Sequence, residues 1–100
     1  MVVSNKIRNS AKGEDCTVNI VGVCNYSPDT VVLAHLPDES KGIGKKADDV
    51  SACYACASCH DAIDRRRYDQ DFEEHREWYL RRAMVRTWRR LVQKGIIVIR

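Results

Sequence analysis

The stretch Cys53–Arg67, which reads CYACASCHDAIDRRR, decides how this chain folds. Three cysteines at three-residue spacing lead into His60, and Asp64 follows one helical turn later. Cysteine and histidine at short spacing are typical of metal sites, and the chain also carries Cys16 and Cys24 upstream. We therefore expect a small domain organised around a metal centre that joins these two parts of the sequence.

The length and the cysteine content indicate one small domain that is stabilised by a metal. A chain of 100 residues buries only about 60–65% of its unfolded surface, so its hydrophobic core is marginal. Five cysteines are many for this length, and metal binding adds directly to folding free energy. The opening residues, MVVSNKIRNS, contain no apolar run typical of a signal peptide, and no window is apolar enough to span a membrane. We therefore expect a cytoplasmic protein without membrane contacts, whose clustered cysteines bind metal rather than form disulfides.

The charges are divided unevenly along the chain. Residues 1–64 hold six Lys/Arg and nine Asp/Glu, whereas residues 65–100 hold eleven Lys/Arg and five Asp/Glu. A basic C-terminal third is typical of a protein that binds a polyanion, but a solvated helix face gives the same pattern. Charge alone therefore leaves both interpretations open.

Composition and periodicity divide the chain into three regions, residues 1–13, 14–70 and 71–100. Residues 1–13 are polar and basic, so we expect a flexible basic arm. In the second region, TVVLAHL at residues 30–36 is predicted to be a strand that carries His35 at its end. The polar loop that follows, residues 37–50, contains Lys45 and Lys46.

Two helices are predicted after the cysteine run. The first begins near Ala57 and ends near residues 68–70. The second begins at Asp71, which we expect to cap it with Glu74 as the reciprocal partner, and it ends at Gly95. Its apolar residues recur on one face and its basic residues on the other, as in an amphipathic helix packed on a core. Residues 96–99, IIVI, are predicted to form a short closing strand of the same domain.

Four kinds of site compete for the cysteines. CASCH at residues 56–60 matches the attachment motif of c-type haem, but haem attachment takes place on exported chains, so we expect no haem. The spacing C-x₂-C-x₂-C at residues 53–59 is compatible with an iron–sulfur cluster whose fourth ligand comes from upstream. A redox dithiol belongs at the start of a helix in a thioredoxin-like fold, for which this chain lacks the strands. The interpretation we favour is structural zinc, which needs four sulfur or nitrogen ligands.

The zinc interpretation pairs Cys16 and Cys24 with Cys56 and Cys59. Such a site ties the N-terminal segment to the start of a helix, which is how a small domain compensates for a limited core. The first pair is spaced C-x₇-C, wider than the usual C-x₂₋₄-C. Cys53 is left over, and we expect it to be a small buried thiol.

His60 and Asp64 remain free for chemistry under this interpretation. An imidazole and a carboxylate one turn apart suit a second, harder divalent cation with open coordination positions. His35 could face that cation, and a neutral imidazole there can take a proton from a water molecule that attacks a phosphodiester. The residues thus indicate metal-dependent phosphodiester hydrolysis as a candidate activity.

Taken in order, these residues resemble the HNH nucleases, which are built on the ββα-metal finger. The matching features are Cys16, Cys24, the segment TVVLAH ending at His35, GIG at residues 42–44, Asp49, and CASCHDAIDRR at residues 56–66. The chain is most similar to the small prophage-encoded nucleases of the YbcO family, and these are similar to the nuclease domain of the phage recombination-enhancement protein Ref. The resemblance covers residues 14–68 closely and the tail through Gly95 more loosely.

The resemblance implies an α+β fold, namely a small zinc-stabilised ββα-metal (HNH) domain with an additional C-terminal amphipathic helix and a short terminal strand. It implies that His35 is the general base and that His60 is a ligand of the catalytic metal, with Asp64 as a second ligand. Ser51 stands where the middle Asn of the HNH motif is usual, and Asp49 nearby is the candidate for its role.

We therefore expect a metal-dependent endonuclease that hydrolyses phosphodiester bonds in DNA, in the cytoplasm of a bacterium that carries a phage or prophage. The expected cofactors are structural Zn²⁺ and catalytic Mg²⁺ or another divalent cation, and the expected partners are DNA and a host or phage recombinase. The candidate phosphate contacts are Arg65, Arg66, Arg67, Lys45 and Lys46. The alternative is a non-catalytic zinc module that binds nucleic acid or a protein partner, which needs the cysteines but neither His35 nor Asp64.

Overall fold

Two short antiparallel strands form the only sheet in the part of the chain that this computed structural model describes, residues 2–36 and 48–100. β1 spans Val32–His35 and β2 spans Ala52–Ala55, with His35 opposite Ala52 and Val32 opposite Ala55. β1 confirms the strand predicted within residues 30–36. The sequence does not predict β2, because all four of its residues are buried and they show no alternation of apolar and polar side chains.

Helix α2, Ala57–Ile63, follows β2 almost directly and begins where the sequence predicts. Cys56 is its N-cap residue, and the Cys56 Sγ atom accepts a hydrogen bond from the backbone N–H of Cys59 at 3.4 Å. The helix ends several residues earlier than predicted, because Arg65 adopts a left-handed φ of 59°. The amides of Arg65 and Arg66 turn back to carbonyls of the last helical turn, which closes the helix in a Schellman arrangement.

The long C-terminal helix predicted from Asp71 is divided into α3, Gln70–Glu74, and α4, Arg76–Gln93. The N-cap is Asp69 rather than Asp71: a carboxylate oxygen of Asp69 accepts from the amide of Phe72 at 2.9 Å. The predicted capping box of Asp71 and Glu74 is therefore wrong. Asp71 instead accepts a hydrogen bond from the hydroxyl of Tyr79 at 3.0 Å, across the break between the two helices.

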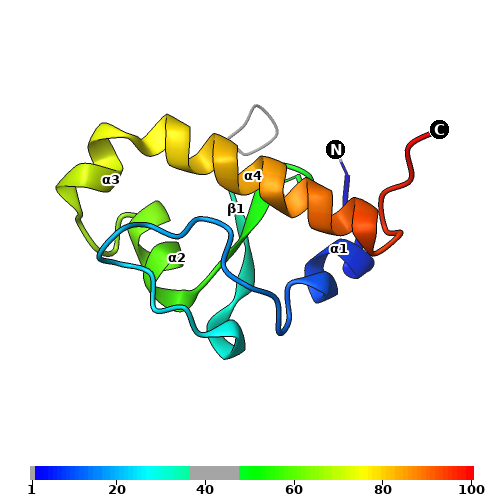
Figure 1. Ribbon diagram of the computed structural model, residues 1–100, viewed down its shortest axis with the longest axis horizontal. Helices are drawn as coiled ribbons and strands as arrows, with labels where there is room; N and C mark the ends of the chain where they lie inside the picture. Colours follow the sequence, from blue (N-terminus) through cyan, green and yellow to red (C-terminus); the bar gives the residue numbers. More distant parts are fainter. Residues whose placement is uncertain (1, 37–47) are drawn as a thin grey trace.

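Helix α4 crosses most of the molecule and packs over the sheet and the segment that precedes β1 (Figure 1). Its buried face confirms the predicted apolar stripe, with Tyr79, Leu80, Ala83, Thr87 and Leu91 all buried. The Thr87 hydroxyl accepts from the Tyr54 amide at 3.0 Å, so α4 satisfies a backbone group on the open edge of β2. In the described part of the chain, no helix is long and apolar enough to cross a membrane.

The C-terminal segment after α4 corrects the prediction of a closing strand at residues 96–99. Gly95 ends the helix as predicted, with a φ of 73°. The amides of Ile96 and Ile97 bond to the carbonyl of Leu91, so these residues complete the helix cap instead of pairing with a strand. Within the described residues, the sheet has two strands only, and Ile99 is 78% exposed.

The N-terminal segment corrects the prediction of a flexible arm, because it contains helix α1, Asn5–Ser10. The Ser4 side chain caps the helix by accepting from the amide of Ile7 at 3.2 Å. Ile7 is buried, and the Ser10 hydroxyl lies 2.7 Å from the hydroxyl of the fully buried Tyr54. These buried contacts help to fix a segment whose composition is otherwise that of a disordered tail.

Candidate metal centre and active site

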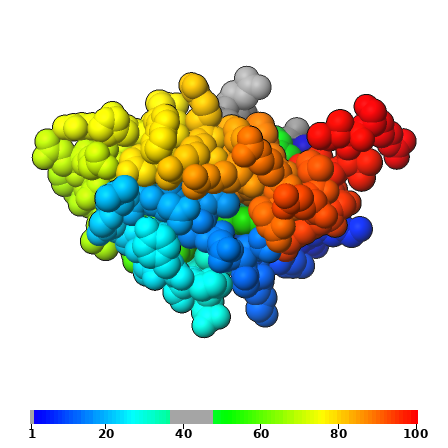
Figure 2. All heavy atoms as spheres, in the orientation of Figure 1, coloured from blue at the N-terminus to red at the C-terminus, as the bar shows by residue number. Residues whose placement is uncertain are grey.

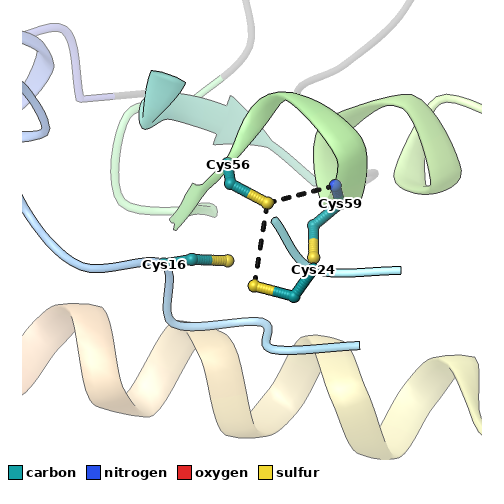
Figure 3. A group of neighbouring side chains, drawn as sticks. All are labelled: Cys16, Cys24, Cys56 and Cys59. Atoms are coloured by element: carbon teal, nitrogen blue, oxygen red, sulfur yellow. Dashed lines mark hydrogen bonds between the residues drawn. The ribbon is translucent and has the colours of Figure 1, made fainter. Parts of the chain in front are cut away.

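Four cysteine sulfurs converge between the N-terminal segment and the start of α2 (Figure 3). Cys16 and Cys24 come from the loop before β1, and Cys56 and Cys59 come from the first turn of α2. All four Sγ atoms lie within 4.8 Å of one another. Cys24 is half-buried and the other three are buried. The structure thus confirms the grouping of these four cysteines predicted from the sequence.

The geometry of the four sulfurs, the cysteine cluster below, fits a tetrahedral thiolate site. A Zn–S bond of about 2.3 Å places the sulfurs of a tetrahedral site about 3.8 Å apart. The Sγ atoms of Cys24 and Cys56 are 3.8 Å apart. Four soft sulfur donors are the ligand set of structural zinc sites, so the cluster could hold a metal ion such as zinc.

Within the cluster, hydrogen bonds favour the thiolate of Cys16, whereas the pKa of Cys59 is raised by its bond to Cys16 and that of Cys24 by burial. The pKa of Cys16 falls to about 5 because the Cys59 thiol donates to it and backbone amides, including those of Val18 and Asn19, add further hydrogen bonds that outweigh burial. The Asn19 side chain also donates to Cys24 Sγ at 3.6 Å. Such hydrogen bonds orient ligands and stabilise their negative charge.

The loop of residues 16–24, here called the cysteine loop, is anchored by α4. Arg82 Nη2 donates to the carbonyl of Val18 at 2.7 Å, and Arg86 Nη1 donates to Asn19 Oδ1 at 3.1 Å. Figure 2 shows the atoms of this loop packed against part of α4. Left-handed φ values at Asn19 and Gly22 let the chain wrap around the sulfurs. Two arginines that the sequence assigns to a solvated helix face therefore hold the cysteine loop in place.

Two more cations of α4 are used by one acidic residue. Glu14 accepts hydrogen bonds from Arg90 at 2.7 and 2.9 Å and pairs with Lys94 at 3.0 Å. The bidentate bond from Arg90 is the main reason that the pKa of Glu14 falls to about 2. Much of the basic character of the C-terminal third thus serves internal contacts, which neither interpretation of the charge pattern predicted.

His35, at the end of β1, is held by Asp49. Its Nε2 atom lies 2.8 Å from Asp49 Oδ1. Asp49 is 1% exposed and also accepts from the Ser4 amide at 2.7 Å and from Arg8 Nε at 3.0 and 3.1 Å. Burial alone would raise the pKa of Asp49, but the bonds from His35, Ser4 and Arg8 outweigh it and hold that pKa below its ordinary value. The His35 side chain remains 27% exposed, so solvent reaches its ring.

His60 and Asp64 form a second pair on α2, one turn after the cysteine cluster. His60 Nε2 lies 3.1 Å from Asp64 Oδ2, and their side chains are 29% and 32% exposed. The contact between His60 and Asp64 agrees with the i, i+4 spacing noted in the sequence, whereas the pairing of His35 with Asp49 was not predicted. Among the described residues, however, only the four cysteines form a group of three or more potential ligands close enough to share one ion. His35 therefore does not lie in the immediate ligand group of His60 and Asp64.

The residues predicted to contact phosphate differ in exposure and in ion pairing. Arg66 is paired with Asp61 at 3.0 Å and with Asp64 at 3.4 Å, whereas Arg67 is exposed. Arg65 is 68% exposed and lies 3.7 Å from Glu73. Lys45 and Lys46 lie outside the described residues.

Cys53 lies in β2, is fully buried, and takes no part in the cluster. Burial raises the pKa of its thiol, so it stays neutral, as expected for a packed thiol.

Sequence reasoning misses the residues that support these sites from a distance. Ser4 and Arg8 hold Asp49 from the segment predicted to be flexible, and Arg82 and Arg86 hold the cysteine loop from α4. A helix N-cap at Ser4 followed by Arg8 one turn later was a local signal that this segment is helical. Nothing in the sequence pairs these residues with their distant partners.

Fold and site together define a small α+β protein with a cysteine cluster that could hold a metal ion and with a His–Asp pair on the helix that supplies two of the cysteines. Residues 5–96 match the family described as "Putative nuclease YbcO", and the chain belongs to this family. It is 41% identical over 92 residues to "Putative nuclease YbcO" of Escherichia coli (strain K12), covering 91% of this chain and 95% of that protein. The protein of the same description from Enterobacteria phage 82 has the same identity and coverage.

A solved structure supports the fold. The chain superposes with a TM-score of 0.71 on the "Structure of a putative bacteriophage protein from Escherichia coli str. K-12 substr. MG1655", at 39% identity. The match covers 90% of this chain and all of that one. The predicted membership of the YbcO family is therefore confirmed, whereas the HNH subtype and the similarity to Ref stay predictions.

Proposed function

We propose that this chain is a metal-dependent endonuclease of the HNH type that hydrolyses phosphodiester bonds in DNA. The observation that supports this most is the His35–Asp49 pair, in which a buried carboxylate holds a solvent-accessible imidazole. The names of the relatives from Escherichia coli and phage 82 point the same way, since both carry the description "Putative nuclease".

His35 acts as the general base in this proposal. The low pKa of Asp49 keeps its carboxylate ionised, and an ionised carboxylate can only accept a hydrogen bond. The proton of the neutral imidazole is therefore on Nε2, which donates a hydrogen bond to Asp49 Oδ1. The lone pair on Nδ1 is then free to take a proton from water as the water oxygen attacks phosphorus. The P–O bond to the leaving oxygen breaks, and the imidazolium is stabilised by the Asp49 charge 2.8 Å away.

His60 and Asp64 would hold the catalytic cation. They offer one nitrogen and one oxygen donor 3.1 Å apart, and both are partly exposed, so a cation there would keep positions for water and phosphate. When bound, such a cation supplies Lewis-acid stabilisation of the negative charge that grows on the phosphate. Arg66, 3.4 Å from Asp64, is placed to attract the same phosphate.

The cysteine cluster has a structural role in this proposal. It joins the cysteine loop to the first turn of α2, and His60 directly follows the ligand Cys59. Zinc at the cluster would therefore fix the position and direction of the helix that carries the catalytic ligands. A recombinase partner remains a prediction from the resemblance.

The test is a plasmid-nicking assay on the zinc-loaded protein. Supercoiled DNA should convert to nicked circles with added Mg²⁺ or Mn²⁺ and stay supercoiled without them, while the zinc content of the protein is unchanged. DNA binding without any cleavage at any divalent metal would reject the enzyme and favour the non-catalytic zinc module.

A further inference from the structure

The turn between α2 and α3, residues 64–69, presents an aromatic ring to solvent among three arginines. We call this segment the arginine turn. Tyr68 is 77% exposed, and the described contacts include no hydrogen bond to its hydroxyl. Isolated exposed tyrosines are common, so the exposure of Tyr68 needs further observations before it indicates a site.

A small cavity lies at the arginine turn. A cavity of about 290 Å³ is lined by Arg65, Arg67, Tyr68 and Glu73. Small-molecule sites start at about 300 Å³, so there is room for one nucleotide rather than for a large ligand. The left-handed conformation of Arg65 produces the turn in which Arg65 and Tyr68 line the same cavity.

The three arginines of this turn differ in how they are ion-paired. Arg66 is held by Asp61 and Asp64, but Arg67 has no ion pair within the described part of the chain. Arg65 contacts Glu73 only at 3.7 Å and is 68% exposed, so this pair contributes little and a phosphate can replace it. Two guanidinium groups are therefore available beside one free aromatic face.

We infer that the arginine turn binds an unpaired nucleotide of single-stranded DNA, with the base stacked on Tyr68 and the backbone phosphates on Arg65 and Arg67. An aromatic side chain with flanking cations is how proteins hold single strands, and the bases of an intact duplex are stacked on each other and cannot reach Tyr68. The role of this site in cleavage rests on the proposed function. Tyr68 follows Asp64 by four residues, at most about 14 Å of chain, so the bound strand leads to the candidate catalytic centre.

The inference is tested by binding to a DNA oligonucleotide, single-stranded or as a blunt duplex, without added divalent metal and with the zinc-loaded protein. Tyr68→Ala should weaken single-strand binding about 5- to 150-fold, which corresponds to the 1–3 kcal/mol of one base–aromatic stack, and should leave duplex binding unchanged. Tyr68→Phe keeps the ring and should bind like the wild type. Tyr26→Ala is the matched control, because Tyr26 is 71% exposed and is not among the residues that line the cavity of the arginine turn.

A single strand that carries 2-aminopurine gives a direct readout of stacking. Its fluorescence should be quenched by the wild type and by Tyr68→Phe, and not by Tyr68→Ala. Equal loss of single-strand and duplex binding in Tyr68→Ala, or no loss of either, overturns the inference.

The nicking assay separates this inference from the proposed function. Cleavage that requires metal, combined with single-strand binding that does not depend on Tyr68, rejects the stacking site and keeps the nuclease. Binding that depends on Tyr68, combined with no cleavage, rejects the nuclease and keeps the stacking site.

Discussion

The Nε2 atom of His35 lies 2.8 Å from Oδ1 of Asp49, and the Asp49 side chain is completely shielded from solvent. A buried carboxylate that also accepts bonds from a backbone amide and a guanidinium cannot easily move, so it fixes the tautomer and the direction of the imidazole. Asp49 lies in the region where an HNH motif has its middle Asn, and we propose that it takes over the orienting role of that residue.

We predict that His35→Ala removes the nicking activity while leaving the fold intact. Loss of a general base lowers the rate by about 10²-fold or more. Truncation of His35 removes one of the hydrogen bonds to the buried Asp49, while those from Ser4 and Arg8 remain, so the free energy of unfolding should fall by about 1–3 kcal/mol. His75→Ala, at an exposed histidine between α3 and α4, is the control and should cut at the wild-type rate. Equal rates for wild type and His35→Ala would remove His35 from the mechanism.

Asp49→Asn should lower the rate less than His35→Ala, by about 10- to 100-fold, because the base remains but its tautomer is no longer fixed. It should also destabilise the protein by about 2 kcal/mol, since Arg8 loses its charged partner. The adjacent Asp48→Asn is the matched control, because among the described residues the Asp48 side chain accepts only a local bond from the Val50 amide. A nicking rate for Asp49→Asn equal to that of Asp48→Asn would reject the orienting role.

The sequence predicts those parts of the site whose residues lie within one helical turn or within one metal-ligand motif. Cys56, Cys59, His60 and Asp64 lie within nine residues, where helical periodicity and metal chemistry fix their relation. Cys16 and Cys24 are assigned to the same site as Cys56 and Cys59 because a zinc site needs four ligands, and not because of their spacing. β1 is predicted for a similar local reason, since its β-branched run ends at a proline.

The rest depends on contacts between residues far apart in the sequence. Ser4 and Arg8 reach Asp49 across 45 and 41 positions, and Arg82 reaches Val18 across 64. No periodicity encodes such pairs, so the arginines of α4 have the pattern of a solvated face and the first residues that of a tail. Strand β2 is not predicted for the same reason. Its residues ACYA are covered by α4 and by the backbone of Thr17, and a strand that is buried on all sides shows no alternation of apolar and polar side chains.

For the metal, we predict about one zinc per chain by elemental analysis, as expected for one tetrahedral site. Cys56→Ser should lose the zinc and unfold at a lower temperature or fail to fold, since binding at such sites stabilises small domains by several kcal/mol. Cys53→Ala is the matched control: it removes a buried thiol outside the cluster, so it should keep the zinc and lose about 1 kcal/mol of stability. Purified wild-type protein without zinc would contradict the structural role of the cluster.

Arg67→Ala should weaken duplex binding by the same factor for every sequence tested. Removing one phosphate contact should lower the slope of log K against log salt by about 0.9. Arg89→Ala is the control, because Arg89 is also exposed but lies on α4. If both variants change the slope equally, the duplex covers α4 as well as the arginine turn, and the assignment of Arg67 as the specific contact fails.

The contact between Glu14 and Arg90 predicts how stability depends on pH. The pKa of Glu14 is lowered from 4.5 to about 2, chiefly by the hydrogen bonds from Arg90, so its stabilising effect is complete above about pH 5.5 and is lost as pH falls towards 2. Glu14→Gln should cost about 1 kcal/mol at pH 7, a value discounted because the Arg90 side chain is 43% exposed. The difference between wild type and variant should shrink below pH 5, whereas loss of zinc in acid affects both proteins alike. Asp15→Asn, at the exposed neighbour, should show no such dependence. A Glu14→Gln difference that stays constant down to the lowest pH at which both proteins remain folded would mean that the ion pair does not stabilise the native state.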